Sequence, residues 1–300
     1  MSAELRTPTR SGFVALAGRP NVGKSTLVNA MVGRKVAIVS DKPQTTRRAI
    51  RGVAVHGETQ VVLVDLPGVQ RPRDALTERM QRRVEHELSE SDAALHVING
   101  EQGAGPGDHF IARTLRDAGV AVVVAVNKVD RLDRPRTAAA LQAAAELEAG
   151  DDVFPVSART GEGVAALVDH LAGLMPEGPF LFGAAERSDQ PLHVILAELI
   201  REQVLRRTFQ EIPHAVEVVV EDVETRKDGL RTVRALVWVE AESQKGILIG
   251  SGGRMIKAIG TAARRELERE LDGRVHLELA VRVRRGWRTD EGLLDRLGIE

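Results

Sequence analysis

The sequence predicts two domains of different class: an α/β domain with a mostly parallel, doubly wound sheet, followed by a smaller α+β domain. From residue 12 to about 172, short β-branched runs alternate with amphipathic stretches, as expected of strands buried on both faces by helices. The last apolar run of the chain, RVHLELAVRVR, instead alternates strictly between apolar and polar residues, which predicts a strand with one solvated face. The strands expected in the first domain are FVALAG, KVAIVS, VVLVDLPG, ALHVING, AVVVAVNKVD and VFPVSA.

A stretch dense in Pro, Gly and polar residues separates the two domains. LMPEGPFLFGAAERSDQPLH interrupts both the helical and the strand periodicity. We therefore expect a first domain over residues 10–175, a linker over 176–192 and a second domain over 193–300. The second domain should contain a helix, two strands, a helix–glycine loop–helix segment and the final strand. One face of the last helix is expected to be lined by Ile256, Ile259, Ala263, Leu267 and Leu271.

Composition excludes several classes of function. The chain has 300 residues, of which 43% are hydrophobic and 28% charged, as in ordinary globular domains. It contains no cysteine, so disulfides, thiolate zinc sites and thiol nucleophiles are excluded. The N-terminus lacks the apolar core of a signal peptide, and no run of about 18 apolar residues occurs, so a cytoplasmic location is expected. The net charge is −1, so any attraction to nucleic acid must come from local clusters of charge.

The first motif predicts a phosphate-binding loop. GRPNVGKST fits GxxxxGK[ST] and stands between an apolar strand and an amphipathic helix, which disfavours a glycine turn that binds nothing. Gly18 and Gly23 allow consecutive N–H groups to converge on phosphate oxygens. Lys24 would add charge at the β- and γ-phosphates, and the Ser25 hydroxyl would ligate Mg²⁺. The expected loop contacts are Gly18, Asn21, Val22, Gly23, Lys24, Ser25 and Thr26.

Two later motifs predict that the nucleotide base is guanine. In NKVD, Asp130 can accept hydrogen bonds from guanine N1–H and from its 2-amino group, whereas adenine offers neither donor. Asn127 would tie this loop to the phosphate loop, and the aliphatic stem of Lys128 would cover the ring. In SAR, after the next strand, the Ala158 N–H is expected to bond guanine O6, and Ser157 to orient the loop. These motifs disfavour a metabolic kinase or ATPase.

Two further segments predict a γ-phosphate sensor. DLPG ends a strand, where Asp65 is expected to act as an outer-sphere Mg²⁺ partner and the Gly68 N–H to meet the γ-phosphate. KPQTTRR lies between the phosphate loop and DLPG, and one of its threonines should close over Mg²⁺. Thr46 is the expected ligand and Thr45 the alternative, because sequence alone leaves the register open. The expected metal ligands are therefore Ser25, Thr46 and Asp65.

Hydrolysis must be organised without the glutamine that positions water in many GTP-hydrolysing enzymes, since Val69 follows DLPG. Asn21 is a candidate to help hold a K⁺ ion that supplies charge where an arginine finger otherwise would. Plain hydrogen bonding within the loop is the alternative role for this residue. The residues expected to act in catalysis are Lys24, Thr46, Asp65, Gly68 and Asn21.

A second glycine loop predicts single-stranded RNA binding. Gly250-Ser251-Gly252-Gly253 fits the GxxG loop that clamps RNA backbone between two helices, although GxxG alone is also compatible with a simple turn. Charge favours RNA: residues 245–288 carry 11 Lys and Arg against 5 Asp and Glu, whereas residues 191–244 carry 7 against 10. The other candidate RNA contacts are Arg254, Lys257, Arg282, Arg284, Arg285 and Arg288. Trp287 either stacks on a base or, as we favour, anchors the C-terminal segment.

Taken in chain order, GRPNVGKSTLVNA, KPQTTR, DLPG, NKVD, VSA, QKGILIGSGGRMIKAIG and RVRRGWR resemble the bacterial Era family of GTPases from about residue 10 onward. The resemblance implies a P-loop GTPase domain followed by a type II KH domain, with Mg²⁺ and GTP or GDP as ligands. It also implies binding near the 3′ end of small-subunit ribosomal RNA, a role in small-subunit assembly and peripheral membrane association, and we expect a monomer. The chain departs from the family at Leu66, where threonine is usual, and at Ser251, where lysine is usual.

Two alternatives to a nucleotide-switched RNA-binding enzyme remain at this stage. In the first, the nucleotide domain only supports the RNA-binding domain and turns over negligibly. In the second, the chain is a metabolic enzyme with a phosphate-binding loop, which NKVD and the absence of an acceptor-substrate domain disfavour.

Overall fold

The computed structural model describes residues 9–42, 45–68, 74–183, 186–209 and 212–299. They form two compact units. The first unit contains most of the chain up to Asp189. The second contains Gln190–Glu300 together with the short segments Ile38–Thr45 and Arg73–Leu76.

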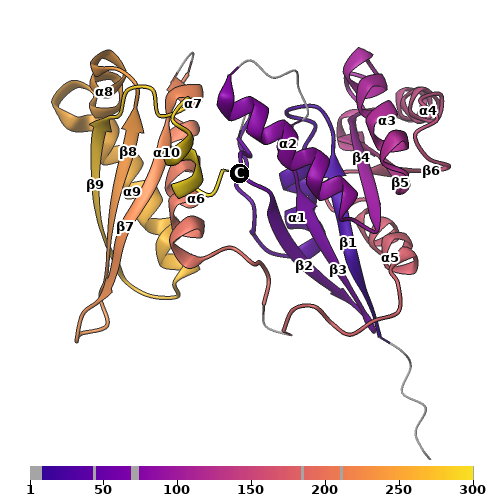
Figure 1. Ribbon diagram of the computed structural model, residues 1–300, viewed down its shortest axis with the longest axis horizontal. Coiled ribbons are helices and arrows are strands. Elements are labelled where there is room, and N and C mark those ends of the chain that lie inside the picture. Colours follow the sequence, from indigo (N-terminus) through magenta and orange to yellow (C-terminus); the bar gives the residue numbers. More distant parts are fainter. Residues whose placement is uncertain (1–8, 43–44, 69–73, 184–185, 210–211, 300) are drawn as a thin grey trace, which may run out of the picture. The chain divides into compact units, whose positions relative to one another are not determined.

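The first unit is built on a six-stranded sheet in the order β2-β3-β1-β4-β5-β6 (Figure 1). Every neighbouring pair is parallel except β2 and β3, so the sheet is mostly parallel as the sequence predicts. Because parallel strands end at one edge, the segments that follow β1, β3, β4, β5 and β6 lie along that edge. The strands are β1 (Arg10–Ala17), β2 (Ile50–His56), β3 (Thr59–Asp65), β4 (Ala93–Asn99), β5 (Ala121–Asn127) and β6 (Asp152–Val156).

Helices cover both faces of this sheet, which makes it doubly wound. On one face, Leu27 of α1 and Leu167 of α5 join a core with residues of β1, β3 and β4. On the other, Val84 of α2 and Ile111 of α3 pack against the alanines of β1, while α4 packs against β5. The helices are α1 (Lys24–Val32), α2 (Ala75–Ser89), α3 (Pro106–Ala118), α4 (Arg134–Ala145) and α5 (Val164–Leu174), with the 3-10 turn η1 (Val129–Arg131).

The structure corrects one predicted strand and adds one that the sequence analysis missed. KVAIVS is not a strand, because the Asn29 side chain binds this segment in place of a neighbouring strand. Its Oδ1 accepts from Val36 N at 2.7 Å and Ala37 N at 2.9 Å, and its Nδ2 donates to Ala37 O. The strand instead forms at β2, where Gly52 and the exposed residues Val55 and His56 obscure the apolar pattern.

The second unit contains a three-stranded sheet in the order β7-β8-β9, in which β7 and β8 are antiparallel and β8 and β9 parallel. One face packs against α6 and α9, whose Leu196, Ile200, Ile259 and Leu267 are fully buried. Leu277, Leu279 and Val283 of β9 pack against the same core, whereas His276 and Glu278 are exposed, as the alternation predicts. The elements are α6 (Leu192–Leu205), α7 (Ile212–Ala215), β7 (Glu217–Thr225), β8 (Arg231–Val239), α8 (Glu242–Ile249), η2 (Ser251–Gly253), α9 (Arg254–Glu270), β9 (Val275–Val283) and α10 (Glu291–Arg296).

The structure bears on two predictions, the extent of the linker and the role of Trp287. Part of the expected linker runs along the first unit, where Glu177 bridges to Arg10 and Ser188 to Gly52. Trp287 is fully buried and its indole N–H donates to Ala215 O at 3.0 Å, so it anchors the C-terminal segment and does not stack on a base. Among the helices in the described ranges, none is long and apolar enough to cross a membrane.

Candidate functional site

The predicted nucleotide motifs all lie at the carboxyl edge of the first sheet. β1 leads into the phosphate loop, β3 ends at Asp65, β5 ends at Asn127 and β6 leads into Ser157. The connection after β1 leads towards β2 and β3, whereas the connection after its neighbour β4 leads towards β5. The loops after β1 and β4 therefore stand at the switch point of the strand order, where ligands bind in folds of this kind. The topology therefore brings together residues that are far apart in the sequence.

The phosphate loop is held in its curve by close packing. Gly23 has φ 102°, and a Cβ at this position would lie 2.4 Å from the Asn127 side chain, so only glycine fits. Gly23 also caps α1 without a side-chain hydrogen bond, which leaves the first N–H groups of the helix for an anion. Gly68 is packed against the same loop, because a Cβ there would lie 2.9 Å from Pro20.

Lys24 supplies the charge of this loop from a buried position. Its Nζ donates to Gly18 O at 3.0 Å and to Arg19 O at 3.3 Å. Burial lowers the pKa of Lys24 to about 8, an effect that Asp65 partly opposes. A phosphate group at this point would replace the water that the ammonium group has lost.

Ser25, Thr46 and Asp65 meet in a cluster of oxygen atoms suited to Mg²⁺. Ser25 Oγ donates to Asp65 Oδ2 at 2.6 Å and lies 3.1 Å from Thr46 Oγ1, which itself donates to Asp65 Oδ2 at 3.3 Å. Asp65 Oδ1 is buried without a hydrogen-bond partner in the described chain, and burial raises the pKa of this carboxyl. Two hydroxyls and a desolvated carboxylate are hard ligands that fit Mg²⁺ beside a phosphate. Thr45 points elsewhere, since its hydroxyl donates to Lys42 O at 2.5 Å.

Asn127 ties the base-reading loops to the phosphate loop. Its Nδ2 donates to Val22 O at 2.9 Å, while its Oδ1 accepts from Lys128 N at 2.8 Å and Ala158 N at 3.0 Å. Lys128 Nζ donates to Asn21 O at 2.9 Å, which adds a second link between the loops. The Ala158 N–H thus has Asn127 as its partner here, and its expected bond to guanine O6 stays a prediction.

Asp130 is held by two neighbours from the loop after β6. Its Oδ1 accepts from Ser157 Oγ at 2.6 Å, and its Oδ2 accepts from Arg159 at 2.5 Å. The hydrogen bond from Ser157, followed by that from Arg159, lowers the pKa of Asp130, so this carboxylate is ionised at neutral pH. Ser157 therefore orients the proposed base reader directly. Sequence reasoning missed Arg159, whose side chain is largely exposed over the carboxylate.

Sequence reasoning also missed an ion pair that joins the phosphate loop to α3. Arg19 Nε lies 2.9 Å from Oδ2 of the fully buried Asp108, and its Nη2 donates to Gly103 O at 3.2 Å. The same Asp108 oxygen accepts from Gly105 N at 2.8 Å, at the start of α3. His96 lies behind, 3.9 Å from Asp108, and burial lowers its pKa to about 4, so it is neutral. The available signal was GPGD, in which a helix-capping Asp follows Pro at the first helical turn.

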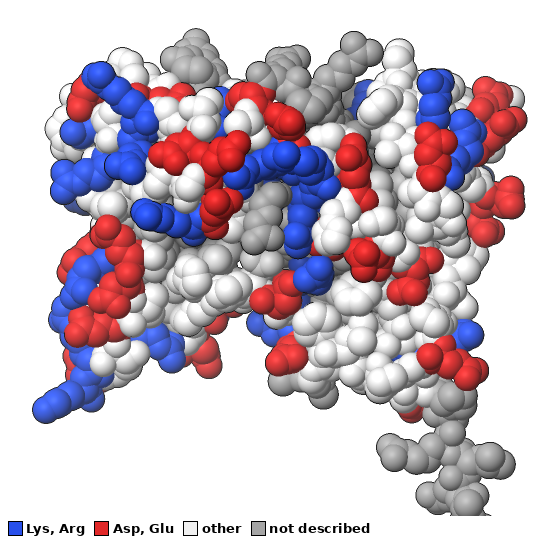
Figure 2. Space-filling model, in the orientation of Figure 1, with Lys and Arg blue, Asp and Glu red and all other residues white. Residues whose placement is uncertain are grey.

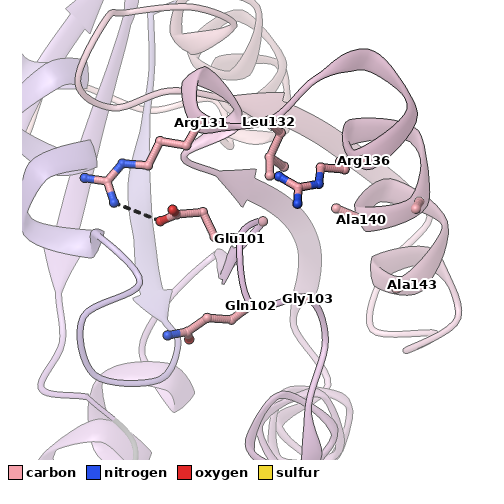
Figure 3. A pocket seen from close by; sticks show the side chains of 10 residues that line it. Glu101, Gln102, Gly103, Arg131, Leu132, Arg136, Ala140 and Ala143 are labelled. Carbon is pink, nitrogen blue, oxygen red and sulfur yellow. Dashed lines mark hydrogen bonds and ion pairs between the residues drawn. The ribbon is translucent and has the colours of Figure 1, made fainter.

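A separate pocket of about 430 Å³ lies beside the base-reading loop (Figure 3). Arg131 reaches Glu101 at 2.9 Å on one side, and Arg136 and Ala140 belong to the α4 side. None of the residues predicted to contact nucleotide lines this pocket. The nucleotide motifs therefore meet in a different part of the edge.

In the second unit, the predicted RNA loop is an exposed turn between α8 and α9. Gly250, Gly252 and Gly253 have φ values of 71°, 60° and 76°, a conformation that other residues adopt with difficulty. Ser251 and Gly252 at the tip of the loop are exposed, whereas Gly250 and Gly253 are half-buried. A strand of RNA can approach such a backbone closely.

A groove of about 360 Å³ lies between α9 and β9. Ile256, Leu277 and Leu279 give it an apolar floor, and Lys257 and Arg264 stand at its edge. This is the apolar groove beside a glycine loop in which unpaired bases are expected to lie.

The other candidate RNA contacts divide into two groups. Arg282, Arg284 and Arg285 are exposed at the carboxyl end of β9, beside the end of β8 that leads to α8. Lys and Arg side chains gather in this area at the upper left of Figure 2, with acidic side chains near them. Arg288 is different, because it is half-buried and pairs with Asp74. It is therefore engaged within the unit.

Sequence comparison identifies relatives along nearly the whole chain. Residues 13–128 match the family model described as 50S ribosome-binding GTPase, and residues 211–288 match the KH domain. A GTPase Era of Mycobacterium sp. (strain KMS) is 45% identical over 294 residues, covering 96% of this chain and 98% of the relative. A GTPase Era of Lactobacillus helveticus is 42% identical over 291 residues, covering 97% and 96%.

Solved structures similar to this chain point to the same relatives as the sequence comparison. A crystal structure of Era in complex with MgGDPNP and nucleotides 1506–1542 of 16S ribosomal RNA has a TM-score of 0.93 at 31% identity, covering 97% of this chain and 99% of that one. A variant of Aquifex aeolicus Era bound to GDP·AlF4⁻ has a TM-score of 0.92 at 32% identity, with the same coverage.

Proposed function

This chain belongs to the Era family of GTPases, and from that premise we propose that it is a nucleotide-switched RNA-binding factor of small ribosomal subunit assembly. It hydrolyses GTP to GDP and phosphate, and its RNA target is the single-stranded segment near the 3′ end of small-subunit ribosomal RNA. The observation that carries the proposal is the presence of a guanine-nucleotide pocket and a glycine-loop RNA groove in one chain.

The roles assigned to the nucleotide pocket follow its contacts. Lys24 binds the β- and γ-phosphates, and Gly68 offers its N–H to the γ-phosphate. Asp130 reads the guanine edge and Lys128 covers the ring. The pocket is supported by the ties of Asn127 to both loops, because these hold base reader and phosphate loop in fixed register.

Mg²⁺ would be held by Ser25 and Thr46, with Asp65 as outer-sphere partner. When bound, the ion neutralises charge that develops on the phosphates. The cluster of the three side chains supports Thr46 over Thr45 as the threonine that senses the γ-phosphate.

Hydrolysis is proposed to be slow and faster in K⁺ than in Na⁺, with Asn21 helping to hold the ion. Val69, which replaces the usual glutamine, lies outside the described residues. Support comes from the strained conformation of Asn21, whose φ of 64° and carbonyl bond to Lys128 keep it at the pocket. Rates measured in K⁺ and Na⁺ with the native protein and with Asn21→Ala test this role. Equal rates in both salts would remove it.

RNA binding is proposed to use the backbone of the glycine loop for phosphates and the α9–β9 groove for bases. Arg254 and Lys257 follow the loop on α9, and Arg282, Arg284 and Arg285 are exposed at the carboxyl end of β9. Their role is supported by exposure and by the excess of positive charge in this region.

The experiment that tests the switch compares RNA affinity in three nucleotide states. A GTP analogue is expected to increase affinity for single-stranded RNA relative to GDP or no nucleotide. Thr46→Ala should abolish this difference, whereas Thr45→Ala, its neighbour with a local hydrogen bond, should keep it. The same affinity in all three states would contradict the proposal and favour an RNA-binding protein with a merely structural nucleotide domain.

Four further proposals rest on the family resemblance and on sequence alone. The domains are assigned to residues 10–175 and 193–300 with a linker between them. The protein is cytoplasmic and monomeric, and it associates peripherally with membrane. Sedimentation velocity and co-sedimentation with anionic vesicles test the last two properties.

A further inference from the structure

The pocket of Figure 3, which the proposed nucleotide site does not use, has two walls from different elements. One wall is the segment 100–103 that follows β4, and the other consists of Arg131, Leu132 and residues of α4. Its volume of about 430 Å³ falls within the range of small-ligand sites, roughly 300–1,000 Å³. The pocket therefore has room for a few amino-acid side chains.

Arg136 brings an unpaired positive charge to this pocket. Its side chain is exposed and extends from the first turn of α4 toward the opposite wall (Figure 3). No carboxylate of the described residues pairs with its guanidinium group, and the nearby Asp133 caps α4 by accepting from the Arg136 N–H at 2.9 Å. Arg131, by contrast, already pairs with Glu101 of the other wall at 2.9 Å. An unpaired guanidinium group offers a planar fork of donors that fits a carboxylate.

The rest of the pocket suits an aliphatic side chain and a peptide backbone. Leu132, Ala139, Ala140 and Ala143 supply an apolar surface, in which Ala140 is buried and Leu132 half-buried. Gln102 is exposed, and its side-chain amide has no hydrogen-bond partner in the described part of the chain. A carboxylate beside an aliphatic side chain, both carried on a peptide, would therefore satisfy the pocket.

The same residues fit nucleic acid poorly. The N–H groups of Gly100 and Gly103 donate to Asn127 O and Asn99 O, so they are not available to phosphates. Glu101 places a negative charge at the site, and the residues that line the pocket include no aromatic ring on which a base could stack. A single unpaired cation is also too few for a run of phosphates. The chemistry therefore favours an acidic peptide over RNA.

Both walls are fixed to the loop that carries Asp130. Gly100 N donates to Asn127 O at 2.9 Å on one side, and Leu132 N donates to Val129 O at 2.9 Å on the other. An occupant that contacts both walls would hold this loop in its present form. If that form binds guanine, the occupant slows the release of GDP, and bound GDP strengthens the binding of the occupant to the same extent.

We propose that this pocket binds an acidic segment of a protein partner and that its occupation slows the release of GDP. A carboxylate of the segment pairs with Arg136, and a neighbouring aliphatic side chain packs against Leu132 and the alanines of α4. The effect on GDP rests on the proposed function, in which Asp130 reads guanine, whereas the binding of the segment does not.

The probes are two short Gly/Ser peptides with blocked ends, one with Asp before Leu and the other with Leu before Asp. Two matched peptides carry Asn in place of Asp, so they differ only in the carboxylate. The variant Arg136→Gln removes the unpaired guanidinium group. Arg134→Gln is the control, because Arg134 is exposed in the same helical turn and does not line the pocket. Thermal unfolding of both variants should match that of the native protein.

At least one acidic peptide is expected to bind the native protein in an NMR titration, with shifts of the amides in segments 100–103 and 131–143. Replacing its Asp by Asn, or Arg136 by Gln, should weaken binding about tenfold, and Arg134→Gln should leave binding unchanged. A saturating concentration of the peptide should slow the dissociation of a fluorescent GDP analogue about fivefold. The peptide should have no such effect on the Arg136→Gln protein.

Four results would overturn the inference. They are no binding of either acidic peptide, equal binding of the Asn peptides, an equal loss in the two arginine variants, and an unchanged rate of GDP release at saturation. Failure of the proposed function looks different, because ATP would then displace the GDP analogue from the native protein as well as GDP does, with or without peptide.

Discussion

The nucleotide pocket and the RNA surface are built in opposite ways. The pocket is made of buried side chains that hold one another: Asn127 bonds the phosphate loop, and Asp65 accepts from both Ser25 and Thr46. The RNA surface is made of exposed glycine backbone and exposed cations that mostly lack partners in the described unit. One site is a connected network, and the other is a sum of separate contacts.

This difference sets how each site should respond to change. In a buried network, removal of one group leaves others unsatisfied, so single substitutions have large effects. On an exposed surface, each cation contributes a modest, salt-dependent share, so single substitutions have small and nearly additive effects. Substitutions of decreasing severity can test whether the two sites follow these rules.

The largest effect is expected on nucleotide preference when Asp130 is replaced, because this residue should bind guanine with both carboxylate oxygens. Asp130→Asn replaces one acceptor with a donor, so it should lower the preference for GDP over XDP by about 10⁴, since xanthine presents a carbonyl where guanine has its amino group. Competition titrations with the four nucleoside diphosphates measure this preference.

The control for this substitution is Arg159→Ala. Arg159 bonds the same carboxylate from an exposed position, so its removal should change GDP affinity by less than about fivefold. A protein with Asp130→Asn that still prefers guanosine nucleotides would show that the carboxylate does not contact the base.

A smaller but still large effect is expected at Asp108. It is fully buried and bonds both Arg19 and the N–H of Gly105, so Asp108→Ala leaves a guanidinium and a helix start without their acceptor. The free energy of unfolding should decrease by about 3 kcal/mol, measured by urea denaturation. Asp117→Ala, an exposed carboxylate on the same helix, should change it by less than ~0.5 kcal/mol. Equal changes in the two variants would show that the Arg19 pair has no structural role.

The sequence predicted the motif residues of the pocket because each motif follows a buried strand, and parallel strands end at one edge. The sequence wrongly predicted a strand at KVAIVS and gave no prediction of β2, in both cases for a local reason. The side chain of Asn29 binds the first segment, and β2 is an antiparallel edge strand with a glycine in its apolar pattern. Arg19 and Asp108 were missed because their pairing depends on how α3 packs, which no local pattern specifies.

The RNA surface was predictable in a different sense. The glycine loop and the total charge could be read from the sequence, but the partners of individual arginines could not. Arg288 is engaged by Asp74, whereas Arg207, which no motif singled out, donates to Gln203 and pairs with no carboxylate of the described residues. Which cations remain available depends on side chains brought together by the fold.

A change of intermediate size is expected in GDP affinity when the pH is raised, because Lys24 loses its proton. Burial lowers its pKa to about 8 in the nucleotide-free protein, while a bound phosphate favours the charged form. Below pH 8 the lysine is already protonated, and above pH 8 binding must take up a proton. GDP affinity should therefore fall about tenfold between pH 7 and pH 9. Calorimetry in two buffers should detect uptake of nearly one proton at pH 9 and almost none at pH 6.5. Affinity that rises with pH, or no uptake at pH 9, would contradict this role.

The smallest effect is expected at Ser251, in the exposed glycine loop. Ser251→Lys adds a cation beside backbone that is proposed to hold phosphates, and it should strengthen binding of single-stranded RNA about two- to fivefold. Because one further phosphate is neutralised, the slope of log K against log[salt] should steepen by about 0.7. Ser251→Gln, of similar length without the charge, should change neither value. The gain should be the same with GDP and with a GTP analogue, since an additive surface contact does not depend on the state of the nucleotide pocket. A gain seen in only one nucleotide state would show that this loop is coupled to the pocket, and the contrast between network and surface would no longer hold at this position.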